Sequence, residues 1–294
     1  MRKTKKRIVI ILHIVLLLAA FAAVELYYSY NTLSETEYEI SSDKISQPVR
    51  MVLIADLHDH SFGTDNVELV DRISKCQPDL ILMAGDFLNS YSEDSSAVII
   101  LVSQLSEIAP VYFSLGNHEK GFIEAGHPEL IEELTASGAV VLDEESAFLA
   151  VNGNDILIGG LYDYAFAYDG KGHMDKTAMD QDMLEFLEEF QGSDLFKIMM
   201  AHRPDSFIFG EAADTWDIDL VVSGHLHGGQ VIIPFVGGLY AGDQGYWPEY
   251  DFGDFHFSAV KDMIITRGLG SQREKLPRFN NPPEIVIIDL VEEQ

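Results

Sequence analysis

The 294-residue sequence contains little cysteine and little positive charge. Cys76 is its single cysteine, so the chain has neither a disulfide framework nor a cysteine-based zinc site of its own. It has 19 lysines and arginines against 48 aspartates and glutamates, which gives a formal net charge of −29. This charge excludes duplex nucleic acid as the main partner, because binding to a phosphate backbone requires clustered cations. Nothing in the sequence indicates an obligate protein partner.

The amino terminus reverses this charge pattern. Residues 1–7 hold five of the 19 basic residues and no acid, and an apolar run follows them, with tyrosines at its end. A helix over residues 8–28 would be about 31 Å long at 1.5 Å per residue, enough to cross a bilayer. We therefore predict a single-pass protein of the cell membrane. The basic segment should stay in the cytoplasm and the rest of the chain should lie outside, because cationic flanks are retained on the cytoplasmic side.

Two other interpretations of the apolar run stay open. Ala20-Phe21-Ala22 has the small residues of a signal-peptide cleavage site, and cleavage would give a secreted protein. A buried core helix is the third interpretation, which the flanking charges disfavour. Residues 29–48 are polar, and we predict that they form a stalk holding a domain at 49–294 off the surface. The 14 basic and 48 acidic residues beyond residue 7 should be repelled by anionic headgroups.

From Val49 onwards, the hydropathy pattern is that of an α/β domain. Short apolar runs at 52–55, 80–83, 111–115, 139–142, 198–201 and 220–223 are typical of strands buried on both faces. Helical periodicity occupies 66–77, 97–108, 128–137 and 179–190. A hairpin is predicted around Asn152-Gly153, and a closing pair of strands at 263–266 and 285–288. Residues 228–250, rich in glycine, proline and aromatics, are predicted to form a long functional loop.

Histidine, aspartate and asparagine follow five of these strands. The clusters are Asp56-Leu57-His58, Gly85-Asp86, Gly116-Asn117-His118-Glu119, His202-Arg203 and Gly224-His225-Leu226-His227. Ligands bind at the carboxyl edge of an open α/β sheet, so these side chains should converge. Imidazole nitrogens with carboxylate and amide oxygens suit Mn²⁺, Fe or Zn²⁺. Seven such groups exceed the need of one ion, which predicts two divalent metal ions, with Asp86 as the bridging carboxylate and Asn117 as a neutral ligand.

In their order and spacing, the clusters resemble the five signature blocks of the calcineurin-like metallophosphoesterases, over about residues 49–290. Four further stretches resemble the bacterial membrane-associated branch of that family: 224–230, 243–245, 267–270 and 282–285. Some members of that branch are phosphodiesterases, or act on the pyrophosphate of UDP-2,3-diacylglucosamine. The resemblance implies a four-layer α/β/β/α sandwich.

The resemblance also implies a role for each residue of the clusters. Asp56, His58 and His227 would hold the first ion, Asn117, His202 and His225 the second, and Asp86 would bridge them. His118 matches the non-ligand histidine of the family, which protonates the leaving oxygen or stabilises the transition state.

The function predicted from these features is phosphoester hydrolysis by a hydroxide generated on the two cations. The substrate would be a small phosphodiester, pyrophosphate or phosphomonoester, with lipid- and nucleotide-linked compounds both open. Arg203, Arg267 and His60 are weaker candidates for substrate binding; the alternative is a structural ion pair for Arg203 and a solvated loop for His60. Two other functions compete: a non-catalytic metal-dependent binding or scaffold protein, disfavoured by the complete ligand set, and a protein phosphatase, disfavoured by the acidic surface.

Overall fold

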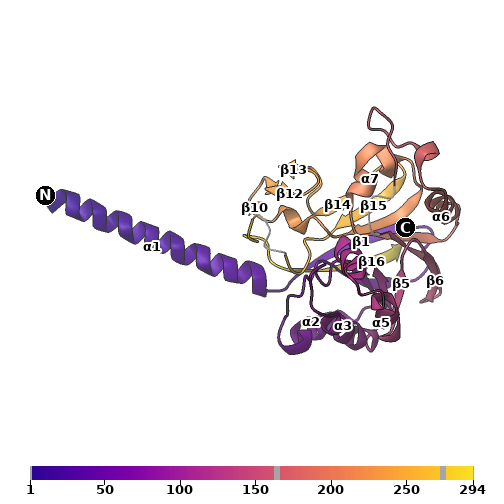
Figure 1. Cartoon of the computed structure of the whole chain (residues 1–294), viewed down its shortest axis with the longest axis horizontal. Coiled ribbons are helices and arrows are strands. Elements are labelled where there is room, and N and C mark those ends of the chain that lie inside the picture. The colour runs from indigo at the N-terminus through magenta and orange to yellow at the C-terminus, as the bar shows by residue number, and fades with distance from the viewer. Residues whose placement is uncertain (1, 162–165, 272–275, 294) are drawn as a thin grey trace.

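A long amino-terminal helix projects from an α/β domain (Figure 1). The computed structural model describes residues 2–161, 166–271 and 276–293. Helix α1 (Arg2–Asn31) contains the stretch Lys5–Asn31, which is long and apolar enough to cross a membrane and whose most apolar part is not buried against the domain. The predicted apolar helix is therefore confirmed. By length and composition it is a candidate span, and a signal sequence meets the same criteria.

The first sheet has six strands in the order β1-β16-β2-β3-β4-β5. Their bounds are Ser34–Ser42 (β1), Glu284–Glu292 (β16), Val49–Ile54 (β2), Leu80–Ala84 (β3), Val111–Ser114 (β4) and Ala139–Leu142 (β5). Strands β2 to β5 are parallel, whereas β16 runs antiparallel to β2 and parallel to β1. The carboxyl ends of β2, β3 and β4 therefore meet at one edge of the sheet.

The second sheet also has six strands, in the order β14-β15-β9-β8-β7-β6. Their bounds are Gly253–Phe255 (β14), Val260–Ile265 (β15), Ile218–Ser223 (β9), Phe196–Ala201 (β8), Asn154–Leu161 (β7) and Ser146–Val151 (β6). The four central strands are parallel and the two edge strands pair antiparallel. The predicted hairpin around Asn152-Gly153 is the β6–β7 connection.

The two sheets pack face to face between two outer layers of helices. Helices α2 (Val67–Cys76), α3 (Ser96–Ser106), α4 (Asn117–Glu124) and α5 (Leu130–Ala136) accompany the first sheet, and α6 (Gln181–Gln191) and α7 (Asp205–Ile208) the second (Figure 1). Alternate residues of a strand enter different cores. Met51 and Leu53 pack between the sheets, whereas Val52 and Ile54 pack towards the helices. This alternation explains why β2 is continuously apolar over residues 51–54, and the predicted α/β/β/α fold is confirmed.

The structure differs from the predicted stalk over residues 34–42. This segment is strand β1, paired in parallel with β16 along its whole length. Tyr38 and Ile40 pack against the core between the sheets, while the glutamates at 35, 37 and 39 are exposed. The alternation of acidic and apolar residues is that of an edge strand with one solvated face, which its polar composition concealed.

Two further predictions need correction. The strands predicted as a closing pair, β15 and β16, lie in different sheets, because an apolar run does not specify which strand it pairs with. The long loop at 228–250 contains two short hairpins. These are β10 (Ile232–Ile233) with β11 (Gly237–Gly238), and β12 (Tyr240–Ala241) with β13 (Gly245–Tyr246).

Candidate metal centre

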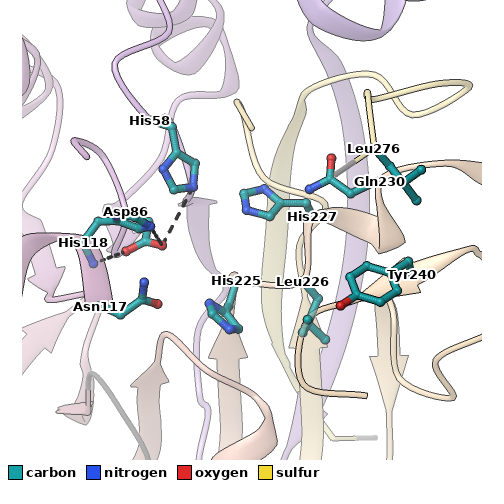
Figure 2. A pocket seen from close by; sticks show the side chains of 11 residues that line it. His58, Asp86, Asn117, His118, His225, Leu226, His227, Gln230, Tyr240 and Leu276 are labelled. Carbon is teal, nitrogen blue, oxygen red and sulfur yellow. Dashed lines mark hydrogen bonds and ion pairs between the residues drawn. The ribbon is translucent and has the colours of Figure 1, made fainter. Parts of the chain in front are cut away.

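The side chains that the sequence singled out as metal ligands gather where the two sheets end. Asp56 and His58 follow β2, Asp86 follows β3, Asn117 begins α4 after β4, His202 follows β8, and His225 and His227 follow β9. Together with His118, six of these eight line one cavity of about 180 Å³: His58, Asp86, Asn117, His118, His225 and His227 (Figure 2). Asp56 and His202 lie fully buried behind it.

The backbone turns sharply at five of these positions. Asp56, His58, Asp86, His225 and His227 all have a positive φ, between 48° and 69°. This conformation is uncommon for residues other than glycine and costs about 1–3 kcal/mol at each position when the surroundings impose it. It turns the chain within two to four residues of the strand ends, so that side chains following β2, β3 and β9 face a shared space.

The first group of candidate ligands is Asp56, His58 and His227, whose donor atoms lie within 4.8 Å of one another. The Nδ1 atom of His58 is hydrogen-bonded to the Asn89 amide oxygen at 3.1 Å. Its Nε2 atom lies 3.9 Å from a carboxylate oxygen of Asp56 and 3.8 Å from one of Asp86. Within the described residues, His58 Nε2 and His227 Nδ1 are buried without a hydrogen-bond partner.

A second group comprises Asp86, His202 and His225, again within 4.8 Å. His202 Nδ1 is bonded to the Ala84 carbonyl at 2.8 Å, which leaves Nε2 facing Asp86 Oδ2 at 3.0 Å. His225 Nε2 is bonded to Asp243 at 2.8 Å, which leaves its Nδ1 for a metal. An outer hydrogen bond of this kind fixes the tautomer and orientation of ligating histidines.

The electrostatics of the cluster match a divalent cation. Burial raises the pKa of Asp56 to about 7 and lowers that of His58 to about 4, so burial alone disfavours both charges. Burial also opposes ionisation of Asp86 and protonation of His202. Their mutual attraction dominates, lowering the pKa of Asp86 and raising that of His202 to about 9. Imidazole nitrogens without a hydrogen-bond partner among the described residues, such as His58 Nε2 and His227 Nδ1, thus lie close to buried carboxylates. These residues fit hard-to-borderline cations bound through nitrogen and oxygen.

His118 lies on the cavity side of this cluster and is oriented by Ser90. Its Nδ1 atom accepts the Ser90 backbone N–H at 3.1 Å and lies 2.8 Å from the Ser90 hydroxyl. A neutral imidazole that accepts at Nδ1 carries its proton on Nε2. His118 Nε2 lies 4.0 Å from Asp86 and borders the cavity, so it presents a donor to whatever binds there.

Glu119 is a supporting residue to which the sequence reasoning gave no role. Its buried carboxylate accepts the backbone N–H groups of Asp86, Phe87 and Gly116, each at 2.8 Å. It therefore joins the turn after β3 to the turn after β4. In Gly116-Asn117-His118-Glu119, an acidic residue three positions after a glycine indicates the start of a helix. The sequence does not indicate that this carboxylate also accepts backbone N–H groups from the turn after another strand.

Asp243 and Arg278 are two further residues whose roles only the structure shows. Asp243 lies in the 243–245 stretch, and its carboxylate orients the His225 ring through the bond to Nε2. Arg278 is fully buried, and its guanidinium donates to the carbonyls of Gly270 and Arg267 at 2.7 and 2.9 Å. These bonds hold the 267–270 turn against the site.

The three weaker substrate-binding candidates are placed differently. The Arg267 guanidinium pairs with Glu284 at 2.7 Å and is not among the described residues that line the cavity. Arg203 lies beside the second group, with Nη1 3.8 Å from Asp243. His60 lines a neighbouring hollow with Asp59, Tyr91 and Ser271 and packs edge-on against Phe62.

The fold and this cluster are those of a metal-binding hydrolase, and comparison with known proteins supports this class. Residues 49–229 match the calcineurin-like phosphoesterase family. Phosphodiesterase YaeI of Escherichia coli is 28% identical over 251 residues, which cover 83% of each chain. The uncharacterized metallophosphoesterase YkuE of Bacillus subtilis is 27% identical over 274 residues, covering 90% of this chain and 87% of that protein.

Among solved structures, the 5′-nucleotidase precursor of Thermus thermophilus superposes with a TM-score of 0.50 at 16% identity, over 76% of this chain. The present chain spans about half the length of that nucleotidase (49%), and the likeness shows a shared fold. The protein described here belongs to the calcineurin-like phosphoesterase family. It is a hydrolase of phosphoester bonds, with clusters of residues that could hold divalent metal ions.

Proposed function

We propose that this protein is a dinuclear metal-dependent phosphoesterase whose site lies outside the cytoplasmic membrane. The observation that carries the proposal is the overlap of candidate ligand groups at Asp86. Its carboxylate belongs both to a group with His58 and His118 and to a group with His202 and His225. A third group, with Asp56 and His227, shares His58. Two ions bridged by one carboxylate satisfy this arrangement.

In this proposal each residue has one task. Asp56, His58 and His227 would hold one ion, Asn117, His202 and His225 would hold the other, and Asp86 would be shared between them. When bound, the ions would supply Lewis-acid activation of a water molecule and neutralise charge on the phosphoryl oxygens. His118 donates its Nε2 proton, or a hydrogen bond, to the leaving oxygen, because Ser90 holds its Nδ1 atom as an acceptor. Gln230, Tyr240 and Leu276 border the same cavity and would contact the remainder of the substrate.

The substrate class and the location complete the proposal. The name of the E. coli relative supports a phosphodiester, and pyrophosphates and phosphomonoesters remain within reach of the same chemistry. The resemblance of the 224–230 and 267–270 segments to the membrane-associated branch supports a small lipid- or nucleotide-linked substrate. We also propose that helix α1 is retained as an anchor with its basic end in the cytoplasm, since five cations precede the apolar run.

The test combines metal analysis with two assays on the full chain purified in detergent. We expect about two divalent ions per chain, together with turnover of a chromogenic phosphodiester or phosphomonoester; comparison of the two assays ranks the substrate classes. Asp86→Asn should lose both metal and activity.

The matched control for this test is Asp254→Asn, in the partly exposed cluster Asp254, His256 and Asp262. This variant should retain the metal and the activity of the wild-type chain. A chain that binds two ions and turns over neither substrate would favour the scaffold alternative. One ion per active chain would refute the dinuclear site.

A further inference from the structure

The two hairpins of residues 231–248 carry an exposed apolar surface that the chemistry of the site does not use. Phe235, at the turn between β10 and β11, is fully exposed, and Val236 beside it is 64% exposed. Tyr246 and Trp247, in and after β13, are 68% and 56% exposed. We call these four residues the hairpin tip. Leu239 joins the two hairpins, since its N–H donates to the Val231 carbonyl and its carbonyl accepts the Trp247 N–H, both at 2.9 Å. A surface that carries several large exposed apolar groups marks an interaction site.

The charge of this segment sets it apart from the rest of the chain. Residues 231–248 contain a single charged residue, Asp243, in a protein whose formal net charge is −29. The Asp243 carboxylate is engaged by His225 at 2.8 Å, at the metal cluster. The hairpin tip therefore lacks acidic side chains, whereas the acidic side chains of the rest of the domain would be repelled by anionic headgroups.

Helix α1 fixes where the hairpins lie relative to the membrane. The ring of Phe21, within the apolar run of α1, lies 6.4 Å from the ring of Phe279, centroid to centroid. Phe21 is ten residues before the end of the helix, or about 15 Å along its axis. Part of the domain thus lies alongside the last turns of the apolar helix rather than beyond its end.

Phe279 joins this contact directly to the first hairpin. Its carbonyl accepts the Ile232 N–H at 3.0 Å, and Val231 forms a β-bridge with it. Two further bonds hold the helix to the same segment: Asn281 N–H donates to Ser29 Oγ and Arg278 N–H to Tyr30 Oη, both at 3.2 Å. Figure 1 shows β10, β12 and β13 on the side of the domain from which α1 leaves.

From this geometry we infer that the hairpin tip rests in the interfacial region of the bilayer that α1 enters. The inference relies on the membrane anchor of the proposed function. Aromatic side chains favour this region because one part of the ring is apolar and the other tolerates water. Since Tyr240 and Gly242 of the second hairpin line the metal cavity, the cavity then opens beside the membrane surface.

Tryptophan fluorescence tests the inference in the full chain, which contains two tryptophans. Trp216 is fully buried, so Trp247 is the residue within reach of lipid. The chain is reconstituted in phosphatidylcholine vesicles whose acyl chains carry bromine, a quencher, close to the headgroup. We expect loss of the Trp247 fluorescence in wild type and no quenching in Trp247→Phe. Phe235→Asp should reduce the quenching, whereas the matched control Phe148→Asp, an exposed phenylalanine on β6, should not.

Flotation of the vesicles and hydrolysis of a soluble phosphodiester distinguish failure of the membrane anchor from failure of the hairpin contact. A chain that does not float with the vesicles refutes both the anchor and the hairpin contact. A chain that floats, hydrolyses the diester and shows equal quenching in wild type and Trp247→Phe refutes the hairpin contact alone. Self-association that Phe235→Asp abolishes, without lipid quenching, would assign the hairpin tip to a second copy of the chain and overturn the inference.

Discussion

Glu119 offers the sharpest test of how the site is held together. Its carboxylate is buried and accepts three backbone N–H groups at 2.8 Å, from the turns that carry Asp86 and Asn117. In Glu119→Gln, the amide group retains one oxygen, which can take the place of Oε2 and still accept from Asp86 and Gly116. The new NH₂ group then faces the N–H group of Phe87, so a donor opposes a donor at that contact.

The magnitude follows from these contacts. Leaving a buried donor unsatisfied costs about 1–3 kcal/mol, so the lost acceptor of Phe87 should lower the free energy of unfolding by about 1–3 kcal/mol. A domain of this size loses roughly 2–4 °C in Tm per kcal/mol, which makes the shift measurable. Metal affinity should fall together with Tm, because the same turns position Asp86.

Thermal unfolding and metal titration of the full chain measure both effects. The matched control is Glu124→Gln, at the exposed end of the same helix, which should change neither quantity by a measurable amount. Wild-type Tm and metal affinity in Glu119→Gln would show that these hydrogen bonds do not support the site, and the reasoning would be wrong.

Three other variants test separate parts of the structure. His118→Ala should retain its metal and lose about 10²–10⁴ in kcat if the side chain donates a proton; loss of metal in the variant would contradict that role. Arg267→Ala should lower Tm and leave KM for a soluble diester unchanged, because Glu284 holds the guanidinium; a raised KM at unchanged Tm would restore the substrate role. Asp219→Asn should lower the free energy of unfolding by about 2–4 kcal/mol near neutral pH, since the carboxylate accepts from Lys44 and Lys261 at 2.7 and 2.6 Å. Burial opposes ionisation of Asp219, but these lysines lower its pKa from the usual 3.8. The difference in unfolding free energy between the variant and the wild type should therefore persist above pH 3.8 and vanish as the pH falls through the folded-state pKa.

The central strands and the candidate ligands could be predicted because each leaves a local signal. Strands such as β2 and β9 contact a core on both faces, so each contains a continuous apolar run, 51–54 in β2 and 220–222 in β9. The ligands follow these strands directly. Strand β1 has no such run, since its outward face is glutamate, and it was interpreted as a stalk.

The supports of the site could not be predicted because their partners are backbone atoms far away in the sequence. Glu119 binds amides of the preceding strand turn, and Asn281 donates to the His227 carbonyl at 2.8 Å across 54 positions. The left-handed backbone at Asp56 and Asp86 is likewise imposed by tertiary contacts. Residue type does not reveal it, because aspartate is not confined to that conformation.

The junction between α1 and β1 is only two residues long, Thr32 and Leu33. A long flexible tether would let the domain keep its orientation while the helix leans. Here the helix leads almost directly into a strand of the sheet, so the helix and the domain must tilt together as one rigid unit. If α1 spans a membrane, a thinner hydrocarbon layer that tilts the helix would tilt the catalytic domain with it. Lipid composition would then change the orientation of the enzyme relative to the membrane without altering any of its side chains.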